Sequence, residues 1–184
     1  DPRDVDDLQS HVFGEACFYE VGFNSEDDDG GVSLTDTIAV VITGNADLMR
    51  SAGYWRHQYR GNGKVDFDAV RLQCFLDIVG HMSSVFHEVV DASTIALAEA
   101  VLDPKGQTTS REQFDRQLLA LWLNFANGAI AFDELVDSDG DTVPDATLLA
   151  FLSSAEAERL LPATTDARIR FLKDLMEVLN TRDG

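Results

Sequence analysis

Four aspartates occupy alternate positions in the nine residues DSDGDTVPD, at positions 137 to 145. Carboxylates this close together repel one another unless they stay hydrated or share a cation. Calcium-binding loops place ligands at positions 1, 3, 5, 7 (through a backbone carbonyl), 9 and 12. Five of these six positions match here, and they are held by Asp137, Asp139, Asp141, Val143 and Asp145. The spacing predicts a calcium site, and the alternative is a solvated acidic turn.

The loop departs from the calcium template at two positions. Position 6, which is glycine in the template because of a sharp turn, is Thr142, and position 12, which is a bidentate acid, is Leu148. Without that acid we expect weak binding, with a dissociation constant of about 10⁻⁴ to 10⁻³ M. Water or one of three nearby acids could complete the shell: Asp133, Glu134 or Glu156.

The same nine residues resemble the thrombospondin type 3 calcium repeat, whose pattern is Asp-x-Asp-Gly-Asp-x-x-Pro-Asp, and more loosely an EF-hand loop between two helices. Only one copy is present, so the resemblance does not imply a tandem array filled with calcium. It does imply ligand roles for Asp137, Asp139, Asp141 and Asp145. It also favours a secreted or cell-surface protein.

The histidines are the other residues that could bind a metal. His11, His57, His81 and His87 show no H-E-x-x-H motif or comparable zinc spacing. Asp77 and His81 lie one helical turn apart, which favours a simple pair interaction over a shared metal. The sequence also lacks nucleophile motifs and a glycine-rich phosphate loop. We therefore expect no enzyme, and the alternative is a metal- or cofactor-binding helical enzyme domain that uses the histidines.

Composition limits the classes of partner. The 33 acids outnumber the 14 bases and give a formal net charge of −19, which argues against nucleic acid and anionic membranes. No apolar run approaches the roughly 20 residues that span a bilayer, so no membrane insertion is expected. The chain opens with Asp1-Pro2, which indicates a processed chain or a piece of a longer one. Cys17 and Cys74 allow one disulfide, which would join two distant segments, but the spacing does not determine whether they pair.

Residues 1–45 have β character. Apolar residues alternate in CFYEVGF at 17–23, IAVVI at 38–42 is β-branched, and a polar turn containing Glu26-Asp27-Asp28-Asp29-Gly30-Gly31 lies between them. These features predict an antiparallel hairpin. The stretch CFYEVGFNSEDDDGGVSLTDTIAVVITGN resembles the last two strands of a PKD or related immunoglobulin-like repeat. That resemblance implies an incomplete sandwich, so we expect either a chain cut from a modular protein or a partner that supplies the missing strands.

Residues 46–65 are interpreted as a linker with an aromatic anchor. The segment Gly53-Tyr54-Trp55-Arg56-His57-Gln58 weakly resembles a Gly-Tyr-Trp signature of helical modules in bacterial secreted proteins. We expect Tyr54 and Trp55 to attach the linker to the helical part of the chain rather than to form a ligand-binding platform.

Residues 66–184 have a helical period, because apolar residues recur at steps of three and four. Asp66, a capping box at Ser110-Arg111-Glu112-Gln113, and Thr164 or Thr165 are the expected helix starts. Five helices are expected, over about 67–89, 95–101, 110–130, 148–161 and 165–179. Short connections between them predict an antiparallel bundle.

The sequence therefore predicts a mainly α protein: a roughly five-helix antiparallel bundle with an N-terminal β-hairpin from an incomplete immunoglobulin-like sandwich. Its expected function is that of a calcium-stabilised structural, adhesive or assembly module of a secreted or surface-exposed bacterial protein. Calcium is the expected cofactor. Self-association or binding of another chain through the N-terminal strands would make the protein a subunit of a fibre or sheath.

Overall fold

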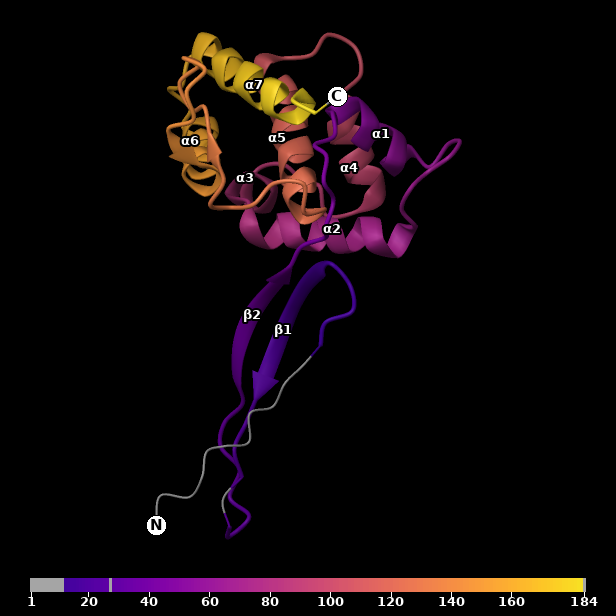
Figure 1. Ribbon diagram of the computed structural model, residues 1–184, viewed down its shortest axis with the longest axis vertical. Coiled ribbons are helices and arrows are strands. Elements are labelled where there is room, and N and C mark those ends of the chain that lie inside the picture. The colour runs from indigo at the N-terminus through magenta and orange to yellow at the C-terminus, as the bar shows by residue number, and fades with distance from the viewer. Residues whose placement is uncertain (1–11, 27, 184) are drawn as a thin grey trace.

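A computed structural model describes residues 12–26 and 28–183. It shows a helical body from which a β-hairpin projects (Figure 1). The predicted mainly α fold with an N-terminal hairpin is confirmed. The described residues form seven helices: α1 (Ala52–Arg60), α2 (Ala69–Met82), α3 (Ser84–Glu88), α4 (Ile95–Leu102), α5 (Ser110–Ala126), α6 (Leu148–Leu160) and α7 (Asp166–Thr181).

The hairpin consists of β1 (Cys17–Phe23) and β2 (Asp36–Ile42), which pair antiparallel from Cys17 with Ile42 to Phe23 with Asp36. An isolated bridge between Glu26 and Val32 continues it toward the turn. In the described residues this sheet has two strands. The immunoglobulin-like origin of the hairpin stays a prediction, and Asp27 of the predicted turn lies outside the described residues.

The first additional helix, α1, lies in the segment that was interpreted as a linker. Ser51 caps it by accepting a hydrogen bond from the N–H of Tyr54, and Gly61 ends it with a left-handed backbone at φ 65°. Trp55 is fully buried and stacks on Phe67 at 5.8 Å between ring centroids. Trp55 thus packs into the helical body, and Ala52–Arg60 forms a helix within the segment that was interpreted as a linker.

The second additional helix arises because the long helix predicted over 67–89 is broken at Ser83. Ser83 adopts an extended backbone that ends α2, and its side chain then caps α3 by accepting from the N–H of Phe86. The start of α2 also differs, because Asp68 rather than Asp66 is the N-cap. Asp66 instead accepts a hydrogen bond from the Tyr54 hydroxyl at 2.8 Å.

The other helix starts lie close to their predicted positions. Thr109 and Glu112 form the capping box of α5, one residue earlier than predicted. Thr94 caps α4, and Thr165, one of the two expected residues, caps α7. Such caps satisfy backbone N–H groups that have no partner inside the helix.

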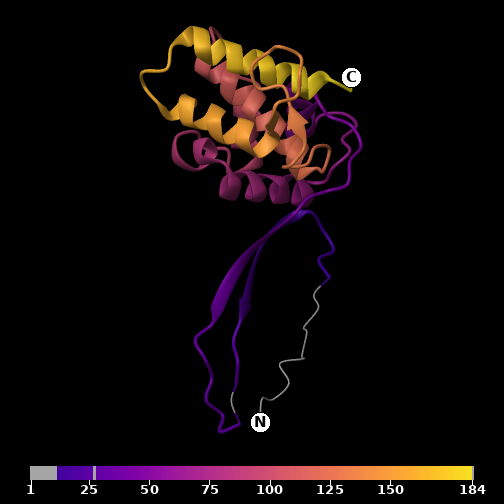
Figure 2. The same ribbon diagram turned by 60° about the vertical axis from the view of Figure 1, so that its left-hand side comes forward.

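The core is built around α5, which contacts α1, α2, α4 and α7. Nearly every residue of α5 from Phe114 to Ala126 is buried, including the polar Asp115 and Asn124. A helix that is covered on all sides must lie at the centre of a bundle, and the ribbon shows α5 enclosed by the other helices (Figures 1 and 2). Among the described helices, none is both long and apolar enough to cross a membrane.

Candidate metal centre

The predicted calcium loop connects two very short strands. Leu135–Val136 (β3) pairs antiparallel with Ala146–Thr147 (β4), and the N–H of Asp145 donates to the carbonyl of Val136 at 3.0 Å. Helix α6 starts directly after β4, with Thr147 as its N-cap. The loop therefore lies inside a small hairpin that leads into α6, rather than directly between two helices.

Asp137 organises the backbone of the loop. Its Oδ1 accepts hydrogen bonds from the N–H groups of Asp139 at 3.2 Å and Gly140 at 2.7 Å, and its Oδ2 accepts from Thr142 at 2.8 Å. Two further carboxylates repeat the pattern, because Asp139 accepts from Asp141 and Asp141 accepts from Val143. The alternating aspartates thus turn the loop back on itself.

This turn brings three of the predicted ligands together. A carboxylate oxygen from each of Asp137, Asp139 and Asp141 lies within 4.8 Å of the other two. Partial desolvation raises the pKa of Asp137, but the backbone hydrogen bonds from Gly140, Thr142 and their neighbours outweigh it, so the net pKa lies below its ordinary value. Asp137 is therefore ionised at neutral pH, as a calcium ligand must be.

Thr142 holds the position that is glycine in the template, and its backbone has the same left-handed conformation. Its φ is 72°, and it is the one non-glycine residue with positive φ in the described part of the chain. A β-branched residue in this region is strained. This conformation lets the N–H of Thr142 donate a hydrogen bond to Asp137 Oδ2, and that bond compensates for the strain.

The remaining predicted ligands lie at the far end of the loop. Asp145 is not part of the three-carboxylate group, and its Oδ1 accepts from the N–H of Ser138 at 3.0 Å, which closes the loop. Val143 is an exposed residue whose side chain makes no part of the core. Its ligand role would be through its carbonyl oxygen only.

Leu148, at template position 12, is fully buried, so this position belongs to the hydrophobic core. Two of the acids that could have replaced the missing ligand are engaged elsewhere. Glu134 pairs with Arg182 at 2.7 Å, and Glu156 accepts from Ser83, Ser84 and Trp122 in the interior. Asp133 is exposed and does not join the described carboxylate group. Water is therefore the remaining candidate to complete the shell.

The loop is packed against α7. A Cβ added at Gly140, whose φ is 82°, would contact the Phe171 ring at 3.4 Å and Leu175 at 3.6 Å. On its other side the loop leads into Thr147 and α6. The conformation of the loop is therefore coupled to the packing of the last two helices.

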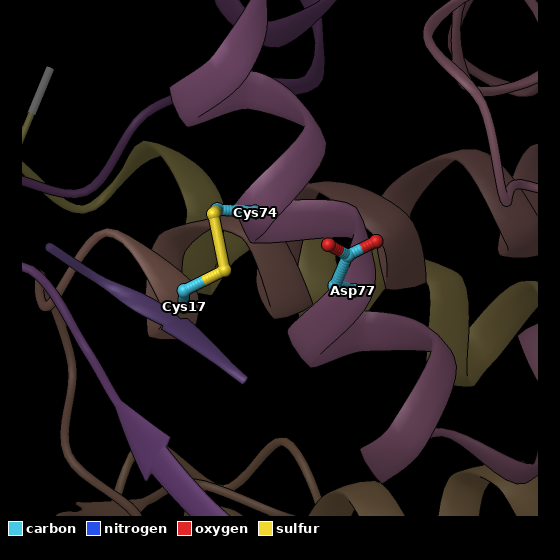
Figure 3. A group of neighbouring side chains, drawn as sticks. All are labelled: Cys17, Cys74 and Asp77. Atoms are coloured by element: carbon cyan, nitrogen blue, oxygen red, sulfur yellow. A yellow bond between two sulfur atoms is a disulfide. The ribbon is translucent and has the colours of Figure 1, made fainter. Parts of the chain in front are cut away.

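A second group of possible ligands contains Cys17, Cys74 and Asp77 (Figure 3). The two sulfur atoms form a disulfide, so neither is a thiolate that could bind a metal. Asp77 accepts a hydrogen bond from Gln73 at 3.0 Å. We therefore do not assign a metal site to this group.

The histidines do not converge on a metal in the described residues. The Nε2 atom of His57 lies 3.1 Å from the Lys64 carbonyl, and the Nδ1 atom of His81 lies 2.7 Å from the carbonyl of Asp77, not from its carboxylate. His87 lines a cleft of about 770 Å³ together with Asp77 and His81. Among the described residues, however, no histidine lies close to two other side chains that could share a metal ion with it. His11 lies outside the described residues.

Glu156 is the site residue whose role the sequence does not reveal. Its Oε1 accepts from the Ser83 hydroxyl at 2.6 Å and the Trp122 indole at 2.7 Å, and its Oε2 accepts from the Ser84 N–H at 2.9 Å. These donors are 34 to 73 positions away. Only the fold brings them together, around the break between α2 and α3.

Comparison with protein-family models, curated proteins and solved structures finds no match to this chain. The function therefore has to be inferred from the chemistry of the loop and of the projecting hairpin.

Proposed function

We propose that this protein is a calcium-stabilised, non-enzymatic structural module that uses its projecting hairpin for assembly with another chain outside the cell. The observation that carries the calcium part is the convergence of Asp137, Asp139 and Asp141 at template positions 1, 3 and 5. The left-handed backbone of Thr142 at position 6 supports it, because the template requires this conformation there.

Five residues would hold the ion: Asp137, Asp139, Asp141 and Asp145 through carboxylates, and Val143 through its carbonyl. Bound calcium would neutralise carboxylates that otherwise repel one another. Because the loop contacts Phe171 of α7 and leads into α6, an ion that binds only the folded loop stabilises this end of the bundle by mass action.

The buried Leu148 favours a structural role over a sensor role. In calcium sensors an acid at position 12 moves with the ion and rearranges the adjoining helix. Leu148 instead belongs to the core, and its N–H donates to the Glu134 carbonyl at 2.9 Å. The start of α6 thus has no acidic ligand that would shift when calcium binds.

One observation supports a location outside the cell, and the expected weakness of the calcium site agrees with it. The Cys17–Cys74 disulfide is of the kind that persists in oxidising compartments. Millimolar calcium, which a weak site requires, is also typical of extracellular modules. The bacterial source suggested by the sequence resemblances is part of this proposal.

The calcium part is tested by thermal unfolding with calcium, with magnesium and with a chelator. At a dissociation constant near 1 mM, roughly 10 mM calcium stabilises the folded protein by about 1.4 kcal/mol. For a chain of this size, that corresponds to a rise in Tm of about 3–5 °C. Magnesium should give a smaller rise, because it requires a compact octahedral shell.

Asp139→Asn should abolish the calcium-dependent rise in Tm, since it removes one converging carboxylate. Asp133→Asn is the matched control: it removes one exposed charge next to the loop but outside the carboxylate group, and should keep the rise. The absence of a rise in the unmodified protein, or an equal rise in Asp139→Asn, would show that the loop is only an acidic turn.

A further inference from the structure

The hairpin presents an apolar face that the described structure covers only in part, with Tyr19, Val21 and Val40 half-buried. Strand alternation places Tyr19, Val21 and Phe23 of β1 on the same face as Ile38 and Val40 of β2; we call these five residues the apolar hairpin face. Phe23 is 53% exposed and Ile38 is 52% exposed. A two-stranded hairpin is marginally stable in water, so this face is suited to burial against another strand.

Side chains at the start of β1 already have partners near the helical body. Cys17 is bonded to Cys74 of α2, and Phe18 stacks on His81 of α2 with ring centroids 3.5 Å apart. Phe13 also packs on Tyr19 with ring centroids 4.6 Å apart. These side chains crowd the space beside β1, whereas among the described residues no disulfide or ring stacking involves β2.

The outer edge of β2 carries backbone groups that have no strand partner in the described residues. The N–H of Thr37 hydrogen-bonds the carboxylate of the preceding residue, Asp36, at 3.0 Å, which indicates that this N–H points away from β1. By the alternation of an antiparallel ladder, the backbone groups of Ala39 and Val41 point the same way. The three residues form a row of outward backbone groups, in which the N–H of Thr37 would exchange its hydrogen bond to Asp36 for one to an added strand.

The charge of the hairpin region has one sign. All charged side chains between positions 12 and 49 are acidic, and this range contains no lysine, arginine or histidine. The acids are Glu15, Glu20, Glu26, Asp27, Asp28, Asp29, Asp36 and Asp47. Glu20 lies on the opposite face from Phe23, next to its cross-strand partner Ala39. Asp36, the partner of Phe23, lies at the end of the apolar face. A strand added beside β2 would meet mainly apolar side chains on that face, and on the other face its long basic side chains would reach Glu20 across Ala39.

We propose that β2 binds an extended segment of another protein in which lysine or arginine alternates with apolar residues, as an added third strand. The backbone row of Thr37, Ala39 and Val41 would hydrogen-bond the segment, and its apolar residues would pack beside Ile38 and Val40. Its basic residues would lie on the face that carries Glu20. This inference rests on the assembly part of the proposed function and is independent of the calcium part.

A second copy of this chain does not fit this edge. Pairing two hairpins would bring two wholly acidic segments within a Debye length, about 8 Å at physiological ionic strength, without any base to compensate. Like charges at an interface suppress the wrong partner, whereas opposite charges select the right one. The acidity thus both protects the exposed edge from self-association and selects a basic strand.

The test uses the full chain and three short synthetic peptides: one that alternates Val and Lys, one of the same composition with Val and Lys in two blocks, and one that alternates Val and Glu. Binding is measured by NMR of the isotope-labelled protein, together with amide hydrogen exchange. The alternating Val–Lys peptide should slow exchange at Thr37, Ala39 and Val41, and the other two peptides should not.

Two variants locate the binding edge. Ala39→Pro removes one outward N–H without removing a bond to β1 and should weaken binding of the Val–Lys peptide roughly tenfold. Ile38→Asp should weaken it by a similar factor through the apolar hairpin face. Val178→Asp on α7 is its matched control, since Val178 is exposed far from the hairpin in sequence, and it should leave binding unchanged. Each variant should keep the melting temperature of the helical body.

Three results would overturn the inference. Equal binding of the block and alternating Val–Lys peptides would show attraction by net charge alone, and equal binding of the Val–Glu peptide would remove the charge argument. Light scattering that shows a dimer, with the β2 amides protected in the absence of peptide, would identify a second copy as the occupant and leave the assembly proposal standing. If calcium failed to raise the melting temperature of the protein, the results of these binding experiments would be unaffected.

Discussion

Cys17, the first residue of β1, is joined to Cys74 within α2 by a disulfide across 57 positions of sequence. The next residue, Phe18, stacks almost parallel on His81 of the same helix. Two adjacent residues of β1 therefore attach the base of the hairpin to α2, while the rest of the hairpin projects from the body (Figures 1 and 3).

Removing the disulfide should lower the free energy of unfolding by about 2–5 kcal/mol, because the unfolded chain regains the freedom that the cross-link had removed. Chemical denaturation of the Cys17→Ser/Cys74→Ser double variant measures this loss. The unmodified protein under reducing conditions should match the variant, and the variant should not respond to the reductant. An unchanged midpoint after confirmed reduction would contradict the prediction.

Removing only Arg159 from its buried ion pair with Asp115 should cost far more stability than replacing both residues. Arg159 donates to the Asp115 carboxylate through Nε at 2.7 Å and Nη2 at 2.8 Å. Arg159→Met leaves a buried charge without compensation and should cost about 3–5 kcal/mol. The Asp115→Leu/Arg159→Met double variant should recover much of this loss. Arg168→Met, which breaks the more exposed pair with Glu158, should cost at most about 1 kcal/mol.

The loss of folding stability caused by Arg159→Met should also depend on pH. Burial raises the pKa of Asp115 above its ordinary value, while Arg159 acts in the opposite direction. A carboxyl group whose pKa is higher in the folded state than in the unfolded state destabilises the fold as pH rises through that range, and not below it. Without Arg159 the loss should therefore be larger at about pH 7 than at about pH 4. Denaturation at both pH values checks this, and an equal loss would contradict it.

Asn124 should be among the polar residues most sensitive to substitution. Its Oδ1 accepts from the Arg50 N–H at 2.8 Å and the Trp55 indole at 3.2 Å, and its Nδ2 donates to the Arg50 carbonyl and to Asn180. Asn124→Ala leaves several of these buried groups unpaired and should cost about 2–4 kcal/mol in denaturant unfolding. Exposed Asn62→Ala is the control and should change stability by less than about 0.5 kcal/mol. Similar losses in both variants would contradict the role assigned to Asn124.

Glycine substitutions should have opposite effects at two positions. Residues 44–46 cross the end of α5, where Gly44 donates to the Ala126 carbonyl at 2.9 Å. A Cβ at Gly44 would collide with the Asn127 carbonyl, so Gly44→Ala should destabilise the protein by about 1–3 kcal/mol. Gly80 lies inside α2 with nothing near its Cβ position, and Gly80→Ala should stabilise the protein by about 0.5–1 kcal/mol. Thermal unfolding of both variants tests the pair, and the same direction in both would contradict it.

Local sequence patterns predicted the elements well where a segment is governed by its own residues. The alternation at 17–23 predicts β1 with the bounds observed, and Thr165 is the observed cap of α7. The conformation of the aspartate loop at 137–145 belongs to the same class, because the hydrogen bonds of Asp137 are all made within five residues. In each case the deciding contacts lie close together in the chain.

The differences arise where distant residues decide. The helical period continues through Ser83, but Glu156 accepts hydrogen bonds from Ser83 and Ser84 and stabilises the break between α2 and α3. The segment 52–60 carries local helix signals in the Ser51 cap and in Gly61 at its end, and its own Trp55 attaches it to the core. The Glu156 contacts that stabilise the break at Ser83 come from another element and leave no local signature.

By itself, the sequence determined the mainly α character, the hairpin, the acidic charge and the spacing of the aspartate loop, because periodicity, turn chemistry and charge are properties of neighbouring residues. Only the tertiary structure decided that Cys17 pairs with Cys74, that Leu148 belongs to the core, and that Glu156 is held by buried donors. It also decided that the hairpin projects from the helical body (Figure 1) and leaves Phe23 and Ile38 exposed, since burial depends on which elements pack together and not on the residues of one element alone.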